Sequence, residues 1–258
     1  MSTSPAPTVT PPVPRDAATV VLLRDQAEGM QVLLVRRHQN SRDMGGLHVF
    51  PGGKLDEADA ESAQALQAHW PSLHQHLGEP ELSPQQAAAL HVAAAREALE
   101  ECGVALDPRA LHPWSRWITP KVPLMMVRRF DTRFFVARLP EGAVAQHDAH
   151  ETTEILWINP RVALERYGRH EMTLAAPQLV SLLHLAQHPN TASVLAEAQA
   201  KAPPLIEPHR LEEDGYTITA YPGDPTHPVR ERVLPLPVTR VYFRDDRFML
   251  APGQDHWL

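Results

Sequence analysis

Apolar runs and turn residues alternate along the first part of the chain. A β-branched apolar run covers residues 17–24, and a second covers residues 30–37. Residues 26–29 between them read Gln-Ala-Glu-Gly, which is typical of a turn, so this pattern predicts a β-hairpin. Further along, the second half of residues 128–137 alternates in the way expected of a core strand.

The clearest helix signal in the chain begins at Ser83. Serine is a favoured N-cap, Pro84 suits the first turn, and Gln86 occupies the capping-box position. Alanine-rich sequence continues to Cys102, and Gly103 is a typical stop, which predicts a helix of roughly five turns. Helices are also expected over residues 159–167, 177–188 and 190–201.

Three carboxylates stand near the end of the helix that begins after Ser83. Glu97, Glu100 and Glu101 are spaced i, i+3 and i+4, so they share one helix face. Their mutual repulsion and the helix dipole oppose this arrangement unless the face is solvated or bridged by a cation. Mg²⁺ and Mn²⁺ prefer oxygen ligands and commonly join carboxylates to substrate phosphates. A solvated helix face is the alternative for such a triad taken alone.

The residues around the triad resemble the signature of the Nudix hydrolases, G-x5-E-x7-R-E-U-x-E-E-x-G-U, where U is a bulky apolar residue. Gly53, after Phe-Pro-Gly, takes the first place, and residues 96–104 match the last block. Asp59 stands where the family has Glu. The 36 residues 60–95 lie between Asp59 and Arg96, where the family has seven. The chain therefore resembles a Nudix enzyme whose signature is split by an insert.

This resemblance implies an α/β fold, namely an α/β/α sandwich around a mixed β-sheet. The helical insert is expected at about residues 60–82, beside the substrate cleft, where a short linker in place of residues 62–82 should be tolerated. A Pro-rich C-terminal extension completes the chain. The resemblance also implies a Mg²⁺ or Mn²⁺ cofactor, and its ligands would be Glu100, Glu101, Glu97 and the carbonyl of Gly52.

The resemblance also suggests which residues take part in catalysis. Glu97 would act as general base or as metal ligand, and Arg96 would hold the carboxylates, pairing with Asp59. Nudix enzymes often place an extra Glu just before a later strand, as a further metal ligand or base. Glu151 and Glu154 are the candidates for this role, and a solvated loop is the alternative for each.

A second resemblance concerns the segment before Phe50. Nudix enzymes that act on coenzyme A show L-L-T-x-R-[SA]-x3-R-x3-G-x3-F-P-G-G, and this chain matches except at Val35 and His38. Arginine can grip the 3′-phosphate of coenzyme A through two hydrogen bonds, although solvated charge is the alternative. The substrate-binding residues implied by this motif and the signature are Arg37, Arg42, Gly46 and Gly53.

The whole pattern resembles the peroxisomal coenzyme A diphosphatase branch of Nudix and its bacterial relatives, over roughly residues 17–245. This implies hydrolysis of coenzyme A or acyl-coenzyme A to 3′,5′-ADP and a 4′-phosphopantetheine. An ADP-ribose or NADH pyrophosphatase and a Nudix isomerase of isopentenyl diphosphate remain alternatives. So does a non-catalytic regulatory module, although such modules usually lose the metal-binding glutamates.

Composition narrows the class of protein and its partners. A net charge of −7 gives no global support for nucleic-acid binding, so the expected partner is a small nucleotide substrate. One cysteine, no apolar run of 18 residues and no apolar leader favour a cytoplasmic protein without a membrane partner. The expected organisation is a disordered arm over 1–15, a Nudix domain over 16–188 and an extension over 189–258. The extension would pack on the domain or on a partner subunit, which leaves a homodimer open.

Overall fold

The predicted hairpin lies at the centre of a mixed β-sheet. Strands β1 (Arg15–Gln26) and β2 (Gly29–Arg37) pair in antiparallel fashion, from Leu23 opposite Val32 to Gln26 opposite Gly29. The computed structural model describes residues 11–41, 44–122, 124, 128–147, 152–236 and 238–252. The predictions for Arg42, for Glu151 and for residues 1–10 of the arm therefore concern residues outside the described ones.

Eight strands form this main sheet among the described residues. The others are β3 (His48–Val49), β4 (Gly52–Lys54), β5 (His112–Ile118), β6 (Phe130–Arg138), β7 (Thr152–Ile158) and β8 (Leu205–Ile206). The order is β3-β2-β1-β6-β5-β8, with β4 also paired to β1 and β7 to β2. Because β1 runs parallel to β6 and antiparallel to β2 and β4, the sheet is mixed, as the Nudix resemblance implies.

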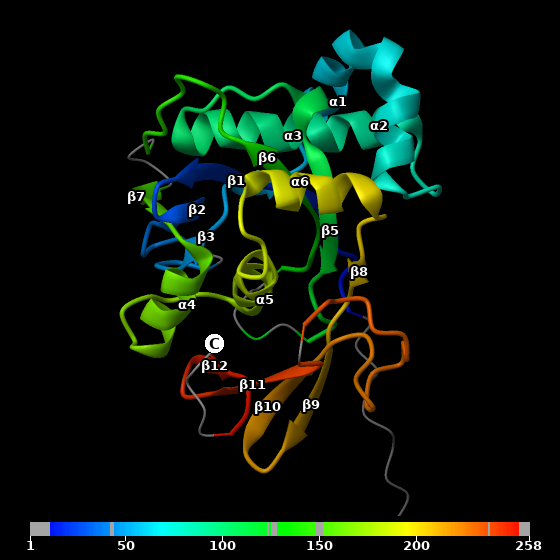
Figure 1. Ribbon diagram of the computed structural model, residues 1–258. Helices are drawn as coiled ribbons and strands as arrows, with labels where there is room; N and C mark the ends of the chain where they lie inside the picture. Colours follow the sequence, from blue (N-terminus) through cyan, green and yellow to red (C-terminus); the bar gives the residue numbers. More distant parts are fainter. Residues whose placement is uncertain are drawn as a thin grey trace, which may run out of the picture.

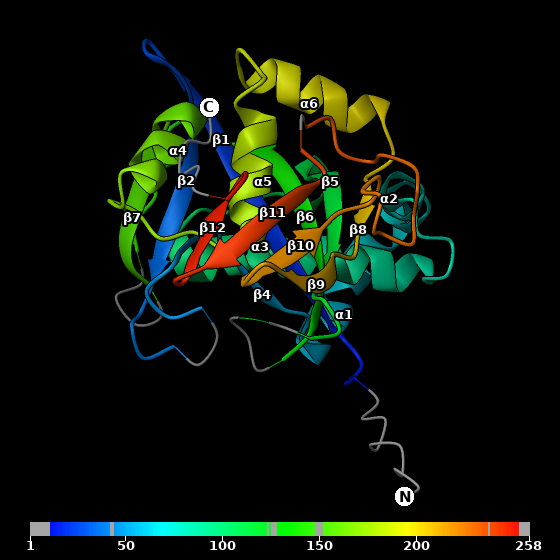
Figure 2. The same ribbon diagram turned by 90° about the horizontal axis from the view of Figure 1, so that it is seen from below.

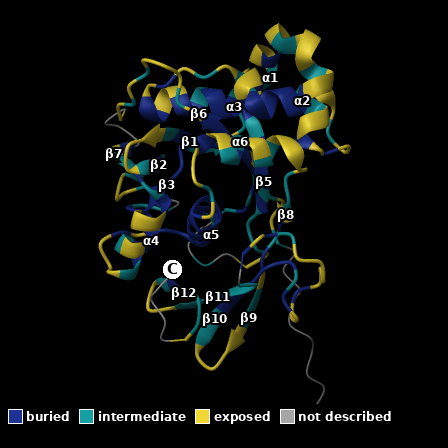
Figure 3. Ribbon diagram, in the orientation of Figure 1, coloured by how far each residue is buried: buried dark blue, intermediate teal, exposed yellow. Residues whose placement is uncertain are grey.

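Helix α3 (Pro84–Cys102) covers one face of the sheet (Figure 1). Its ends are as predicted, because Ser83 and Gln86 form a capping box and Gly103 ends the helix at φ +67°. Alanines such as Ala94 and Ala98 lie fully buried against the sheet, together with Val20 and Phe135. Small side chains let the helix axis approach the strands closely, and the central part of α3 is accordingly buried in Figure 3.

Helices α4 (Pro160–Gly168) and α5 (Ala176–Leu185) cover the other face, and α6 (Thr191–Ala200) packs along β5 and β6. Figure 1 shows α3 and α5 on opposite sides of the sheet. The molecule thus has the predicted α/β/α layers. No helix among the described residues has the length and apolar character needed to cross a bilayer.

The C-terminal extension packs on the α5 side of the same chain. Its strands β9 (His209–Glu213), β10 (Tyr216–Ala220), β11 (Arg240–Arg244) and β12 (Arg247–Met249) form a second antiparallel sheet, which crosses α5 when seen from below (Figure 2). Tyr221 and Phe248 join the main core, and the Phe248 N–H donates to the Tyr167 hydroxyl over 2.8 Å. Strand β8, which comes from the extension, pairs with β5 and so completes the edge of the main sheet. The extension and the main sheet are therefore part of one folded unit.

A buried ion pair secures this extension. Asp224 has no exposed surface and accepts hydrogen bonds from Arg240 at 2.6 and 2.7 Å. Burial opposes its ionisation, but the bonds from Arg240 and Thr226 outweigh burial and hold the pKa of Asp224 below its ordinary value. The carboxylate therefore closes the turn between β10 and β11.

The insert is more deeply integrated than the sequence predicts. It contains α1 (Glu57–Ser62), a 3₁₀ turn (Ala63–His69) and α2 (Trp70–Leu77), which pack on α3 beside one another. Leu77 is 1% exposed and belongs to the core beneath α3. No described insert residue beyond Asp56 lines the large cavity described below. The insert therefore does not border this cavity as expected, and its buried contacts count against exchange for a linker, which stays a prediction.

Glu79 at the end of the insert explains why such an exchange would be costly. Its carboxylate accepts hydrogen bonds at 2.6 and 3.0 Å from Arg133, a guanidinium on β6 with 2% exposure. Arg116 also reaches Glu79, at 2.9 Å, and Asp131 and Asp16 complete the network. Without the insert, a buried arginine would lose its main counter-charge.

Replacing Glu79 by Ala should lower the free energy of unfolding by about 3 kcal/mol, because it removes the buried carboxylate that binds Arg133 through Nε and Nη2. The matched control is Glu81→Ala, whose exposed carboxylate also pairs with Arg116 but should contribute less than about 1 kcal/mol. Urea denaturation of the two variants measures the difference. Equal losses in both would contradict the proposed anchoring of the insert.

Candidate active site

The two halves of the split signature meet where β4 lies beneath α3. The Gly52 N–H donates a hydrogen bond to Glu101 Oε2 over 3.1 Å. Gly53 touches Glu97 so closely that a Cβ on Gly53 would stand 2.4 Å from Glu97 Oε1. Strand β4 is held in this place by pairing with β1, where Gly52 lies opposite Thr19. The glycines are thus required by close approach of the backbone to two carboxylates.

Arg96 holds the carboxylate cluster together. Its Nη1 donates to Glu97 Oε1 at 2.8 Å and to Glu100 Oε2 at 2.9 Å. Its Nε and Nη2 bind both oxygens of Asp59 at 2.8 and 3.0 Å, and Nη2 also reaches the Lys54 carbonyl at 3.1 Å. The hydrogen bonds to Asp59, followed by the attraction of Glu97, raise the pKa of Arg96 despite its partial burial. The predicted pairing of Arg96 with Asp59 is therefore present, and the shorter Asp side chain is sufficient.

The three glutamates differ in their exposure. Glu97 and Glu101 are buried, whereas the side chain of Glu100 is 57% exposed. Arg37 approaches Glu101 at 3.8 Å, and its buried Nε has no hydrogen-bond partner among the described residues. One glutamate thus faces solvent while the other two are fixed by backbone and guanidinium groups.

Two predicted site residues lie apart from this cluster. Gly46 adopts φ +76° in the turn after β2, where its carbonyl accepts a bond from Thr173, so the structure gives it a backbone role. Glu154 is exposed on β7 opposite Arg36 and does not line the cavity. The start of β7 does reach the carboxylate helix, because the Thr152 hydroxyl donates to the Glu101 carbonyl at 3.3 Å.

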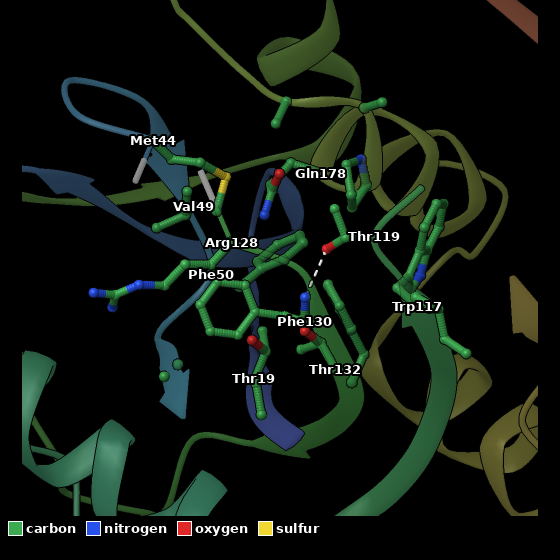
Figure 4. Close-up of a pocket in the computed structure, with 18 of the residues that line it drawn as sticks. Thr19, Met44, Val49, Phe50, Trp117, Thr119, Arg128, Phe130, Thr132 and Gln178 are labelled. Carbon is green, nitrogen blue, oxygen red and sulfur yellow. Dashed lines mark hydrogen bonds between the residues drawn. The ribbon is translucent and has the colours of Figure 1, made fainter. Parts of the chain in front are cut away.

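A cavity of about 540 Å³ opens from the carboxylate cluster. Gly53, Glu97 and Glu100 line its charged part. Its remaining wall comes from β1, β5, β6, α5 and the C-terminal sheet, and Figure 4 shows Phe50, Trp117 and Phe130 around it. An amphipathic molecule with one anionic part and one apolar part fits such a cavity.

The cavity carries more positive than negative side chains, in contrast to the chain as a whole. Among the described residues, six cationic side chains line it: Arg15, Arg37, Lys54, Arg96, Arg128 and Arg210. Three acidic side chains line it: Asp56, Glu97 and Glu100. Since the net charge of the chain is −7, this local excess favours an anionic ligand.

Several residues of this cavity could not be predicted from local sequence patterns. Trp117, Gln178 and Arg210 come from three separate elements, and none belongs to one of the motifs described above. They meet in the cavity only because β5, β6, α5 and β9 pack around the same space.

The carboxylate cluster is suited to a hard divalent cation. Glu97, Glu100 and Glu101 supply oxygen donors, and the absence of a side chain at Gly53 leaves Glu97 against the backbone of β4. Arg96 offsets only part of the negative charge, because it must also neutralise Asp59. The residues present therefore fit Mg²⁺ or Mn²⁺.

Comparisons with known proteins agree with this geometry. A crystal structure of a NUDIX hydrolase from Alicyclobacillus acidocaldarius superposes with a TM-score of 0.58 and 25% identity, covering 76% of this chain and 99% of that one. The family model described as the NUDT19 Nudix domain matches residues 106–185. The matched segment and the fold are those of Nudix proteins. The matched residues lie C-terminal to the signature. The match therefore does not depend on Glu97, Glu100 or Glu101.

Curated relatives are similar to this Nudix protein over part of their length. The acyl-coenzyme A diphosphatase NUDT19 of Homo sapiens is 28% identical over 231 residues, covering 62% of this chain and 61% of that protein. The protein of the same name from Gallus gallus is 30% identical over 145 residues, covering 55% of this chain and 37% of that one. The matches thus span less than two thirds of either relative.

Gly53→Ala should reduce kcat/KM by roughly 10- to 100-fold, because the added Cβ displaces Glu97 from its place in this Nudix site. The fold should survive, since the atoms it meets belong to the flexible end of a side chain. The control is Gly142→Ala, where a Cβ meets nothing within 4 Å and only backbone strain at φ +75° is added. Kinetics and melting temperature are measured for both. A folded Gly53→Ala variant with full activity would show that the position of Glu97 is unimportant.

Proposed function

We propose that this Nudix protein is a metal-dependent diphosphatase that hydrolyses coenzyme A or acyl-coenzyme A. The products would be 3′,5′-ADP and a 4′-phosphopantetheine, acylated when the substrate is. The observation that carries the proposal is one cavity with the Glu97–Glu100 cluster on one part of its wall and apolar side chains on another. A diphosphate joined to an apolar, flexible arm matches both parts.

The chemistry asked of the site is addition of water across a P–O–P bridge. Water attacks one phosphorus, one bridging P–O bond breaks, and a carboxylate takes the proton of the water. A bound Mg²⁺ or Mn²⁺ would supply charge neutralisation at the phosphoryl oxygens and activation of water. Glu100 and Glu101 are the proposed ligands together with Gly52, while Glu97 serves as ligand or base.

The surrounding residues orient these groups. Arg96 fixes Glu97 and Glu100, which lie one and four residues further along α3. Arg37 lies at the same cavity wall with its buried Nε unsatisfied, so it can donate a hydrogen bond to a phosphate oxygen without first leaving Glu101. Lys54 also lines this wall, and its ammonium group forms an ion pair with Asp56.

Coenzyme A is favoured over other diphosphates by the apolar wall and by the similarity to acyl-coenzyme A diphosphatases. Phe130, Phe134 and Trp117 offer a surface for the pantetheine or acyl arm. ADP-ribose and NADH share the diphosphate but have no such arm, and they are the alternative substrates.

The experiment is a parallel assay of coenzyme A, dephospho-coenzyme A, ADP-ribose and NADH with Mg²⁺ or Mn²⁺. Coenzyme A should have the highest kcat/KM, and excess chelator should abolish turnover. Dephospho-coenzyme A should be roughly 10- to 150-fold poorer, since it lacks a charge-assisted contact of ~1.5–3 kcal/mol. Product masses identify the bond that is cleaved.

Two results would contradict the proposal at different levels. A tenfold preference for ADP-ribose or NADH would reject coenzyme A and retain the diphosphatase. Absence of turnover with all four substrates, in folded protein with added metal, would favour a binding or regulatory role.

A further inference from the structure

Arg210 brings a positive group to the cavity from the C-terminal sheet. It lies on β9 directly opposite Thr219 of β10 in the strand register. Both residues line the cavity, together with Pro208 and Phe248 from the same extension. The extension thus closes one side of the cavity with a charged side chain, although no signature residue lies in it.

Two of the three nitrogens of the half-buried Arg210 guanidinium are buried without hydrogen bonds. Its Nε and Nη1 have essentially no exposed surface and no partner among the described residues. Buried Arg129 and Arg133 and half-buried Arg116 differ in this respect, because each of them binds a carboxylate at 3.1 Å or less. A buried cation without its counter-charge is costly to a folded protein.

The charged groups around Arg210 do not offset that cost. Burial lowers the pKa of Arg210 to about 10, and only weak attraction from Tyr221 and Glu212 opposes it. The Glu212 carboxylate is engaged at 2.7 Å by the Thr217 hydroxyl on the neighbouring strand. An anion that enters the cavity would therefore find a guanidinium with free donors.

Two neighbouring polar groups have unused hydrogen-bonding capacity as well. Thr219 Oγ1 and Gln178 Oε1 are buried without a partner among the described residues. Thr219 is 2% exposed and Gln178 is 4% exposed, and both line the cavity that Arg210 lines. Figure 4 shows Gln178 beside the cavity, on the α5 side. Three unsatisfied polar groups from β9, β10 and α5 thus share one space.

We propose that Arg210, Thr219 and Gln178 form a subsite for a second anionic group of the substrate, a phosphate monoester or a carboxylate, separate from the diphosphate. This inference deepens the proposed function and rests on it. Arg210 would donate Nε–H and Nη1–H to the anion, and the Thr219 hydroxyl would add a third donor. Gln178 Oε1 would accept from a hydroxyl or amide N–H that the substrate carries near that anion.

Two parts of an acyl-coenzyme A could supply the anionic group that this subsite binds. One is the 3′-phosphate of the nucleotide, and the other is a carboxylate at the end of a dicarboxylic acyl group. Coenzyme A against dephospho-coenzyme A tests the first source, and malonyl- against acetyl-coenzyme A tests the second. The variants are Arg210→Met, which removes the charge at similar length, and Arg210→Lys, which keeps the charge but loses the two-pronged geometry.

In one of the two substrate pairs, the wild-type protein should prefer the substrate with the extra anion, either coenzyme A or malonyl-coenzyme A, by at least about tenfold in kcat/KM. In Arg210→Met this ratio should fall to within about twofold of unity, with Arg210→Lys in between. The matched control is Arg244→Met, an exposed arginine of the same C-terminal sheet that lies outside the cavity lining. It should keep the wild-type ratio. Ratios near unity in wild type, or ratios unchanged in Arg210→Met, would overturn the subsite.

Binding without turnover separates this inference from the proposed function. Calorimetric titration without metal compares 3′,5′-ADP with 5′-AMP, and malonyl- with acetyl-pantetheine, in wild type and in Arg210→Met. The extra anion should improve Kd about tenfold in wild type only, even if no coenzyme A ester is hydrolysed. Equal binding in both proteins would reject the subsite even if coenzyme A is hydrolysed.

The stability of the ligand-free protein gives an independent readout. Removal of an unpaired buried charge should leave the melting temperature of Arg210→Met equal to or above that of wild type. A clear decrease would show that Arg210 serves the fold, and would count against a ligand role. Thr219→Val, which keeps the shape of the side chain, should lower the same preference ratio by a smaller factor than Arg210→Met.

Discussion

The guanidinium of Arg96 is the interaction on which the site depends. Glu97 and Glu100 would repel each other on the face of α3, and Arg96 draws both toward one point at 2.8 and 2.9 Å. The same side chain binds Asp59 and the Lys54 carbonyl, so it joins helix α3, strand β4 and the first helix of the insert. Five donors in a fixed plane make this possible, and lysine could not replace them.

The contacts of Arg96 explain how the two halves of a split signature still come together in the folded chain. Asp59 lies in the first turn of α1, where its carboxylate also accepts the Asp56 N–H at 2.9 Å. The insert is thereby fixed at its beginning by Arg96, and Glu79 fixes its end to Arg133. The insert lies between these two ion pairs, and α3 still contacts β4 directly. A long insertion is tolerated because both of its ends are held by buried charge pairs.

Local signals in the sequence predicted the elements that carry the carboxylates. The Ser83 cap, the Gly103 stop and the hairpin at residues 26–29 depend on neighbouring residues only, and the structure has all three. Motif resemblance added the meeting of Gly53 with Glu97, which lie far apart in the chain.

The remaining features depend on packing between residues far apart in the chain. Such packing produces no periodic pattern of hydrophobic residues in the sequence. Strand β8 is two residues long, and its place in the main sheet depends on β5. Likewise, nothing local to Glu79 shows that it meets Arg133, and nothing local to Arg210 shows that it faces the cavity. A charged residue in a sequence is usually solvated, so its burial is visible only in the folded chain.

The central claim is that Glu97, Glu100 and Glu101 on α3 bind a divalent cation. Its most direct test is titration with Mn²⁺, followed by electron paramagnetic resonance, of wild type, Glu100→Gln and Glu101→Gln. Exposed Glu61 on α1 supplies the control variant Glu61→Gln. The Kd should rise by at least 10-fold in both site variants and stay unchanged in the control, since even outer-shell partners of a metal contribute ~10- to 100-fold. Equal Mn²⁺ binding by all four proteins would contradict the account.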